Sequence, residues 1–228
     1  MRNSGRALQA GLKLILRALI IVAGIYIVGI LARYLSDTLA ALAYLPLLLW
    51  LVFSGAVLFF FRDPTPNVPE DKNCVLSPAY GRIDVIEEYT EPEFMNGACR
   101  RISMFLSPLD VHTESAPVSG KIAFLKHNPG KFFAAMKTDC GLHNENVLIG
   151  IESPEIPGGK MGIRLIAGYL ARRCLPWVKP GDQVIRGERI SIIQFGSRCD
   201  VYIPLQMKVV VNIGDKVKGG ETILAKLS

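Results

Sequence analysis

The residues with the greatest potential for chemistry are three histidines and one serine. His127 and His143 lie in stretches rich in Gly, Asn and Pro, which favour solvated loop positions. His112 differs, because it follows an apolar run and stands two residues after Asp110. Ser197 follows Gly196 between two apolar runs; such a pair is typical of a turn, but this serine is also the remaining nucleophile.

Common metal and cofactor motifs are absent from the sequence. There is no HExxH or other ligand cluster, so no metal site is expected, and there is no Walker loop, GxGxxG or GxSxG motif. The five cysteines are odd in number and form no CxxC pair, which favours reduced thiols over a disulfide framework. These exclusions leave His112 and Ser197 as the residues to explain.

The first quarter of the chain is far more apolar than the rest. Ala18–Ala32 carries no charge, and after a short polar break Thr38–Phe61 forms 24 uncharged residues. A helix of that length spans roughly 36 Å, enough for a hydrocarbon core of about 30 Å. We expect residues 1–61 to form a two-helix transmembrane hairpin, with a signal peptide as the alternative for the first segment.

The distribution of charge supports this hairpin. Residues 1–61 hold five basic residues and one acidic residue, whereas the remaining 167 hold 21 and 19. Basic residues precede the first span and Arg62 follows the second, while the loop holds only Arg33, offset by Asp37. The positive-inside rule therefore places both ends of the hairpin in the cytoplasm. The nearly balanced remainder has no basic run with interleaved aromatic residues, so nucleic-acid binding is not expected.

Residues 62–228 read as a β-rich domain of short apolar, β-branched runs separated by Gly and Pro. The runs are Arg82–Ile86, Arg101–Phe105, Lys121–Leu125, Val147–Ile151, Gly162–Ile166, Ile190–Gln194, Val201–Ile203, Lys208–Val211 and Thr222–Ala225. Their length and spacing are typical of a sandwich or barrel. A short helix is expected at Ala167–Arg173, where Ala, Leu and Arg favour it.

The sequence of this domain also repeats itself. The pattern G-D-x-V-x-x-G-E-x-I occurs at 181–190 and again at 214–223, and Ser77–Ile83 is echoed by Ala116–Ile122. Both patterns occur in barrel-sandwich domains of the lipoyl and biotinyl carrier type, whose glycines form tight turns between strands. We therefore predict a mostly β (α+β) domain with duplicated barrel-sandwich, lipoyl-like modules; chance similarity of β-turns is the alternative.

Many short segments of the chain occur in the same order in one known family. They are Phe60–Pro64, Ser77–Ala79 with Gly81, Arg101–His112, Ala116–Gly120, Pro129–Phe132, Asn144–Asn146, Ala167–Arg173, Lys179–Asp182, and Phe195–Arg198 with Asp200–Tyr202. Through these segments residues 58–228 resemble the phosphatidylserine decarboxylase proenzymes of the short, archaeal type, which also occurs in bacteria. The N-terminal hairpin fits that family as well.

The resemblance implies a lyase that makes its own cofactor. Ser197 would attack the Gly196 carbonyl, and cleavage between them would leave a β chain of 1–196 and an α chain of 197–228 headed by a pyruvoyl group. That group would take up the substrate amine as a Schiff base and act as the electron sink for loss of CO2, converting phosphatidylserine to phosphatidylethanolamine. By resemblance, His112 is the base for self-cleavage and a proton donor after decarboxylation. Arg198, beside the serine, is the best candidate for binding the substrate phosphate.

One position departs from the family pattern. The orienting aspartate usually lies in an S-P-A-D-G motif, and Tyr80 occupies its place here. A carboxylate stabilises an imidazolium, whereas a neutral tyrosine can only hydrogen-bond. Three interpretations stay open: Asp110, or less readily Asp84, substitutes for the missing acid; Tyr80 orients His112 itself; or the chain is a slow or uncleaved proenzyme.

Two other functional classes stay open. One is a membrane-anchored carrier or adaptor of the lipoyl or biotinyl type, based on the repeated Gly-Asp turns and on Met207-Lys208; the other is an inactive homologue. For the decarboxylase, the expected partners are a membrane phospholipid and the α and β chains of one proenzyme, with a homodimer because family members commonly dimerise. The sequence does not choose between a diacyl and an ether-linked lipid. The expected location is the cell membrane, with the catalytic domain on the cytoplasmic side.

Overall fold

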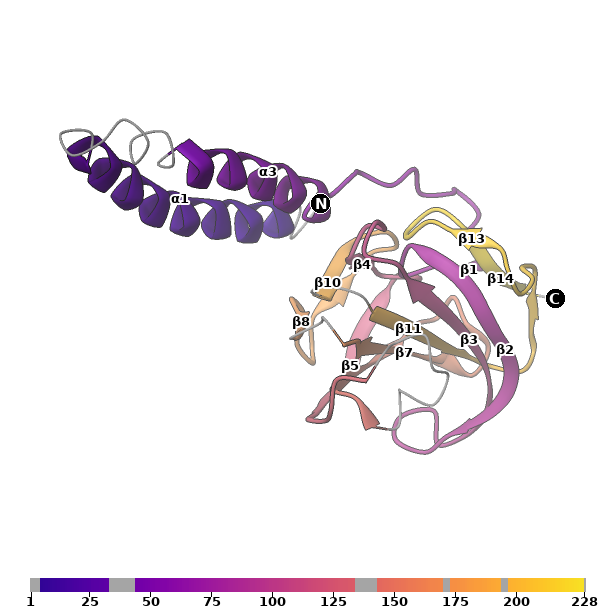
Figure 1. Ribbon diagram of the computed structural model, residues 1–228. Helices are drawn as coiled ribbons and strands as arrows, with labels where there is room; N and C mark the ends of the chain where they lie inside the picture. The colour runs from indigo at the N-terminus through magenta and orange to yellow at the C-terminus, as the bar shows by residue number, and fades with distance from the viewer. Residues whose placement is uncertain (1–4, 33–43, 134–142, 170–172, 194–196, 228) are drawn as a thin grey trace. The chain divides into compact units, whose positions relative to one another are not determined.

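The computed structural model contains two compact units, Gly5–Asp63 and the chain from Pro64 onward. The first holds two helices and the second holds the strands (Figure 1). The residues that the structure describes are 5–32, 44–133, 143–169, 173–193 and 197–227.

Two apolar helices make up the first unit. Helix α1 runs over Arg6–Ala32 and helix α3 over Tyr44–Phe60. The two helices contact each other: the indole Nε1 of Trp50 on α3 donates a hydrogen bond to the carbonyl oxygen of Ile15 on α1 at 3.2 Å. The predicted pair of N-terminal helices is therefore present.

The lengths of the two helices differ from the prediction. Within the described residues, one helix is long and apolar enough to cross a membrane, Arg6–Leu31, with 26 residues and a mean hydropathy of 2.6. The segment expected to be the stronger span, Thr38–Phe61, contributes a helix of 17 residues, and residues 38–43 lie outside the described part. Helix α1 is longer than its uncharged run because the Leu, Ala, Lys and Arg residues before Ala18 also favour helix.

Short strands make up the second unit. In chain order the described strands are β1 (Cys74–Leu76), β2 (Gly81–Glu91), β3 (Gly97–Leu106), β4 (Thr113–Ser115), β5 (Gly120–Asn128), β6 (Asn146–Glu152), β7 (Lys160–Ala167), β8 (Cys174–Pro176), β9 (Gln183–Val184), β10 (Arg189–Ile193), β11 (Ser197–Ile203), β12 (Met207–Val209), β13 (Lys216–Val217) and β14 (Ile223–Leu227). A 3-10 turn, η1, covers Pro157–Gly159. Each predicted apolar run overlaps a strand. The prediction of a helix at Ala167–Arg173 is wrong for the residues of this range that the structure describes, since Ala167 ends β7 and Tyr169 lies in a bend.

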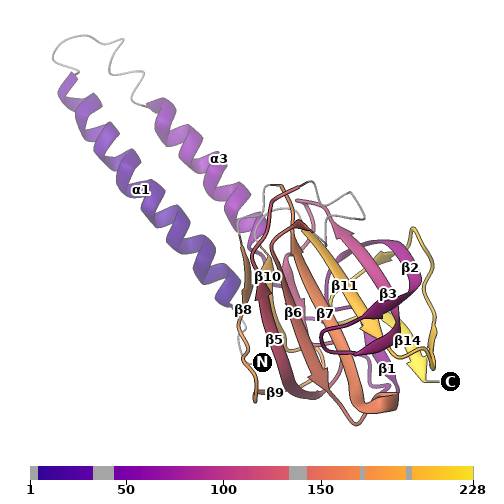
Figure 2. The same ribbon diagram turned by 90° about the horizontal axis from the view of Figure 1, so that it is seen from below.

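One curled antiparallel sheet dominates the second unit (Figures 1 and 2). Its strand order is β13-β2-β3-β11-β7-β6-β5-β9, so β11 and β7 lie at its centre. Two smaller sheets have the orders β1-β14-β12 and β4-β10-β8. Buried residues of all three sheets, such as Ile190, Val201 and Leu224, belong to a single hydrophobic core. The mostly β prediction is confirmed.

The two faces of strand β11 have different environments. Its alternate residues Cys199, Val201 and Ile203 belong to the main core. Tyr202 belongs to a second, smaller cluster with Phe94 and Leu148. Because successive side chains of a strand point to opposite faces, Ser197 faces the main core and Arg198 faces the other side.

The repeated sequence segments share local structure. Strands β9 and β13 come from the two copies of the Gly-Asp pattern and form the two outer edges of the large sheet. In the other repeat, a Cβ on Gly81 would lie 2.4 Å from the Phe105 carbonyl oxygen, and one on Gly120 would lie 2.3 Å from that of Glu152. Both positions therefore admit only glycine, because the neighbouring strand leaves no room for a side chain.

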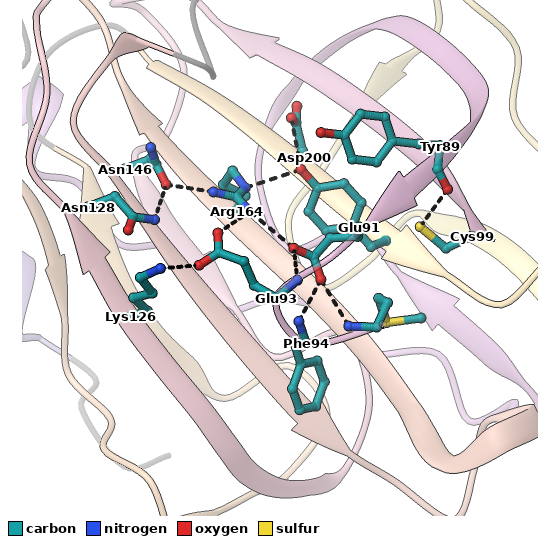
Figure 3. Close-up of polar contacts among 12 residues, drawn as sticks. Tyr89, Glu91, Glu93, Phe94, Cys99, Lys126, Asn128, Asn146, Arg164 and Asp200 are labelled. Carbon is teal, nitrogen blue, oxygen red and sulfur yellow. Dashed lines mark hydrogen bonds and ion pairs between the residues drawn. The ribbon is translucent and has the colours of Figure 1, made fainter. Parts of the chain in front are cut away.

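A polar cluster lies on the face of the sheet opposite to Ser197 (Figure 3). The guanidinium of Arg164 on β7 donates to Glu91 at 3.2 Å, to Glu93 at 3.0 Å and to the Asn146 side chain at 2.9 Å. Glu91 is fully buried and also accepts the backbone N–H of Phe94 at 2.7 Å. Arg164 therefore neutralises the buried carboxylate of Glu91 and joins β7 to the end of β2.

We expect Arg164→Met to destabilise the domain by about 3 kcal/mol or more, because it leaves the buried carboxylate of Glu91 without its counter-ion. Lys126→Met is the matched control, since Lys126 is exposed and its ion pair with Glu93 is worth about 1 kcal/mol or less. Thermal unfolding of both variants tests this prediction. Equal losses in the two variants would contradict it.

Candidate active site

Ser197 is the first residue of β11 and is held by strands on both sides. It pairs with Leu106 on β3 and with Ala167 on β7. Its side chain is fully buried, and its Oγ makes no hydrogen bond with any other described residue. A buried hydroxyl without a partner is costly, so this atom calls for a functional explanation. Gly196, the predicted partner in cleavage, lies outside the described residues.

His112 lies next to the strand that leads to Ser197. The backbone N–H of Ile193, the last residue of β10, donates to the His112 carbonyl oxygen at 3.1 Å. The imidazole is buried, and its Nδ1 lies 2.9 Å from the carbonyl oxygen of Asp110. A carbonyl can only accept, so Nδ1 of the neutral ring carries the proton and Nε2 has the lone pair. His112 is thus oriented to act as a base through Nε2.

Asp110 contributes its main chain, not its carboxylate, to this arrangement. Its Oδ2 accepts the backbone N–H of Ser107 at 2.8 Å and so closes the turn before His112. Its carbonyl oxygen is the acceptor for the histidine ring. The turn therefore fixes the tautomer of His112 without placing a carboxylate on it.

Asp84 and Arg198 pair with each other. The Arg198 guanidinium donates to both carboxylate oxygens of Asp84 at 2.7 Å, and its Nε lies 3.4 Å from Asp200. Arg198 is almost fully buried and lies on the face of β11 opposite to Ser197. Binding of a substrate phosphate by Arg198 stays a prediction, and it would require this ion pair to open.

Tyr80 lies in the segment that runs beside β4. The Pro78 carbonyl oxygen accepts the backbone N–H of Ser115 at 2.8 Å. The Tyr80 ring packs against Gly219, where an added Cβ would lie 3.1 Å from the ring Cδ2. The position that usually holds an aspartate is thus filled by a partly exposed aromatic ring close to β4.

Glu114 on β4 is a buried acid that the sequence does not mark. Its side chain is fully buried; Oε2 accepts the Ser191 hydroxyl at 2.6 Å, and Oε1 makes no hydrogen bond within the described part of the chain. Because His112 extends the pairing of β4 with β10, residues 112 and 114 share one face. The only signal in the sequence was a glutamate two residues after the histidine.

Burial dominates the electrostatics of the Glu114 carboxyl. Burial raises the pKa of Glu114 to about 8, although the Ser191 hydrogen bond and the charge of Arg189 lower it. Burial also raises the pKa of the Cys199 thiol, and the Glu114 charge adds to that shift. Cys199 is two residues after Ser197 on the same face of β11. Glu114 and Ser197 are therefore both fully buried, and Glu114 shares its strand face with His112.

The other chemical candidates lie elsewhere. His127 is exposed on β5, with Nε2 3.4 Å from Glu145, and His143 is also exposed. The described cysteines, Cys74, Cys99, Cys174 and Cys199, are buried free thiols. Over the same residues, no group of three or more His, Cys, Asp or Glu side chains is arranged to hold a metal ion.

Comparison with known proteins places this site in a family. A model of the phosphatidylserine decarboxylase family matches residues 53–225. The chain belongs to the phosphatidylserine decarboxylase family. Membership confirms the resemblance seen in the sequence and the prediction of a decarboxylase enzyme. The matched region contains Tyr80, His112, Glu114 and Ser197.

Several relatives named phosphatidylserine decarboxylase proenzyme are similar over most of their length. Those of Desulfotalea psychrophila and Symbiobacterium thermophilum are each 38% identical to this chain. The first match covers 78% of this chain and 83% of the relative, and the second covers 83% and 90%. The relative from Chlorobium phaeovibrioides is 40% identical over 79% of each chain. The name proenzyme supports the prediction that the chain is made as a zymogen.

The buried Glu114 carboxyl predicts how the stability of this family member varies with pH. Between pH 4.5 and about 8 the native state keeps a proton that the unfolded chain releases, so stability falls as the pH rises through that window. Glu114→Gln removes this loss, which is on the order of a few kcal/mol. We expect the variant to gain thermal stability relative to the parent chain on going from pH 5 to pH 8. Parallel melting curves at both pH values would contradict the assignment.

Proposed function

We propose that this chain is a phosphatidylserine decarboxylase that matures by self-cleavage at Gly196-Ser197 and then converts phosphatidylserine to phosphatidylethanolamine and CO2. The observation that carries the proposal is the buried Oγ of Ser197, which has no hydrogen bond to any described residue and lies four residues beyond the backbone hydrogen bond from Ile193 to His112. The names of the relatives support the substrate.

Self-cleavage begins with Ser197. Its Oγ gives a proton to His112 Nε2 and attacks the carbonyl carbon of Gly196, so that the peptide C–N bond breaks and an ester replaces it. Removal of the Ser197 Cα proton then expels the Gly196 carboxylate by β-elimination. Water replaces the amine nitrogen, which leaves as ammonia, and a carbonyl remains at residue 197. The products are a β chain of 1–196 and an α chain of 197–228.

The start of β11 suits a pyruvoyl group. All the carbon atoms of the group come from Ser197, whose side chain is buried and whose Oγ has no described hydrogen bond that cleavage would have to break. When present, the group supplies the electron sink for decarboxylation. His112 holds the proton for the product carbon at Nε2, because its Nδ1 is tied to the Asp110 carbonyl. The surrounding core excludes bulk water.

We propose that Glu114 provides the carboxylate that position 80 lacks. The carboxylates of Asp110 and Asp84 are bonded to Ser107 and Arg198, whereas Glu114 shares a face with His112 and has one oxygen without a described partner. When ionised, it would stabilise the imidazolium that forms as Ser197 loses its proton. The charge of Arg189 lowers the pKa of Glu114, and the charge of Glu114 in turn raises the pKa values of Cys174 and Cys199.

The proposal includes a duplicated, lipoyl-like β module. The duplication is supported by the positions of β9 and β13 at the two edges of the large sheet, and by the close backbone contacts at both Gly81 and Gly120. Helix α1 and the basic residues around the hairpin support a cell-membrane location with the domain in the cytoplasm. The partners are a membrane phospholipid and, by family resemblance, a second copy of the chain. A carrier function is less well supported, because Lys208 pairs within a sheet and does not lie at a hairpin tip.

The first test is the mass of the purified full chain. We expect two fragments divided between residues 196 and 197, with the short fragment starting in an amine-reactive carbonyl. Ser197→Ala is the control and should stay a single chain, because no hydroxyl is available to attack. A single 25.0 kDa species that retains Ser197 would overturn the self-cleavage proposal.

The second test separates Glu114 from Tyr80. We expect Glu114→Gln to slow self-cleavage by about 100-fold or more, because the imidazolium loses its carboxylate. The rate of the parent chain should rise with pH up to about 8 as Glu114 ionises, and the variant should lack that rise. Tyr80→Asp should restore cleavage in the Glu114→Gln background. Glu188→Gln, at a buried carboxylate that closes the turn before β10, is the matched control and should cleave at the parent rate.

The proposed role of Glu114 fails if Glu114→Gln cleaves at the parent rate with an unchanged pH profile. It also fails if Tyr80→Asp gives no rescue in a folded double variant. Circular dichroism of each variant distinguishes loss of the fold from loss of the acid.

A further inference from the structure

The end of the sheet that carries Ser197 is formed by five neighbouring strands. By their pairing, the last residues of β3, β7 and β5 lie at the same edge as the first residues of β11 and β6. Figure 2 shows these strands side by side. The described loop residues that follow β3, β5 and β7 therefore leave the sheet at the same edge as Ser197.

Large apolar side chains project from three of these loops. Leu109 follows β3 and is 69% exposed, and Tyr169 follows β7 and is 75% exposed. Phe132 and Phe133 follow β5 and are 39% and 44% exposed. We call these four residues the apolar rim. Exposure of this much apolar surface in one place marks an interaction site more often than a solvated loop.

The rim residues are held in place by specific hydrogen bonds. The buried side chain of Asn144 accepts the Phe133 N–H at 2.9 Å and donates to the Phe133 carbonyl oxygen at 2.9 Å. The same side chain donates to the Ala167 carbonyl oxygen at 2.7 Å, which joins the loop after β5 to the end of β7. The Leu109 N–H donates to the Ser107 hydroxyl at 3.2 Å. The backbone around Phe133 and Leu109 is thus fixed while their side chains stay exposed.

Basic groups accompany the rim. Lys131 Nζ lies 5.6 Å from the centre of the Phe133 ring, and Arg173 is exposed after Tyr169. The nearby carboxylates are engaged, since Asp110 accepts from the Ser107 backbone and Glu145 lies 3.4 Å from His127. Aromatic and aliphatic side chains beside lysine and arginine match the boundary between the acyl chains and the anionic headgroups of a bilayer.

We infer that the apolar rim inserts into the surface of an anionic lipid bilayer and presents the buried region around Ser197 to the headgroups. The inference deepens the proposed function, because it rests on a lipid substrate that must reach this edge without leaving the membrane. Helix α1 is long and apolar enough to keep the chain at a membrane, but a tether alone does not decide which face of the domain meets the lipid. In this inference the apolar rim determines which face of the domain meets the lipid.

Depth-dependent fluorescence quenching tests the inference on the full chain. Tyr169→Trp and Leu109→Trp are placed one at a time, and each protein is reconstituted in phosphatidylcholine vesicles containing phosphatidylglycerol, with or without bromine on the acyl chains. Ile185→Trp is the matched control, because Ile185 is 61% exposed but follows β9 at the opposite end of β5. The parent chain, with Trp50 and Trp177, sets the background.

We expect bromine to quench the added fluorescence at positions 169 and 109 and to leave that at 185 unchanged. Quenching at none of the three positions, or equally at all three, would overturn the inference. These outcomes do not depend on catalysis, so a chain that shows the expected pattern but no decarboxylation would contradict the proposed function alone.

A second measurement connects the rim to turnover. In Leu109→Ser/Tyr169→Ser we expect the ratio of activity on vesicle-borne to monomeric short-chain phosphatidylserine to fall about tenfold or more, since two apolar contacts with the bilayer are lost. An unchanged ratio would overturn the inference while leaving the proposed function intact.

Discussion

Strand β11 is hydrogen-bonded on both sides, to β3 and to β7, from its first residue onward. This pairing is the constraint on which the rest of the site depends. It holds Ser197 at the head of a central strand, in a position that a serine in an ordinary turn would not keep. Since the neighbouring strands end at the same edge, it also brings the loops after β3 and β7 around that serine. The position of the reacting residue is therefore a property of the sheet.

The alternation of β11 separates two kinds of polar chemistry. The inner face carries Ser197, which is fully buried, and burial also raises the pKa of Glu114 on strand β4. On the outer face, Arg198 is neutralised by Asp84 and Asp200. The outer groups form ion pairs with one another, whereas Ser197 Oγ makes no hydrogen bond with any described residue. Buried polar groups without hydrogen bonds, and acids with shifted pKa values, occur often at active sites.

The exchange of an aspartate for Tyr80 can be understood in the same terms. Segment 77–81 and strand β4 are neighbours, joined by the hydrogen bond from Ser115 to Pro78. In the proposed mechanism Glu114 on β4 takes the role of an acid at position 80. Position 80 is partly exposed, whereas Glu114 is fully buried. The higher pKa of Glu114 follows from that burial.

The sequence by itself determined the apolar N-terminal helices, the principal strands, the Gly-Ser pair and the family. These features depend on local composition, on period-two alternation and on short motifs, which need no knowledge of distant residues. Only the tertiary structure decided that Arg198 points away from Ser197, that the Asp110 carbonyl binds His112 Nδ1, and that Glu114 is fully buried on β4. The pairing of the short strands β4 and β10 positions Glu114. Neither strand carries a sequence pattern from which its pairing partner can be predicted. Burial, pairing and the pKa of an acid are set by residues far apart in the chain, so they emerge only when the sheets close around one core.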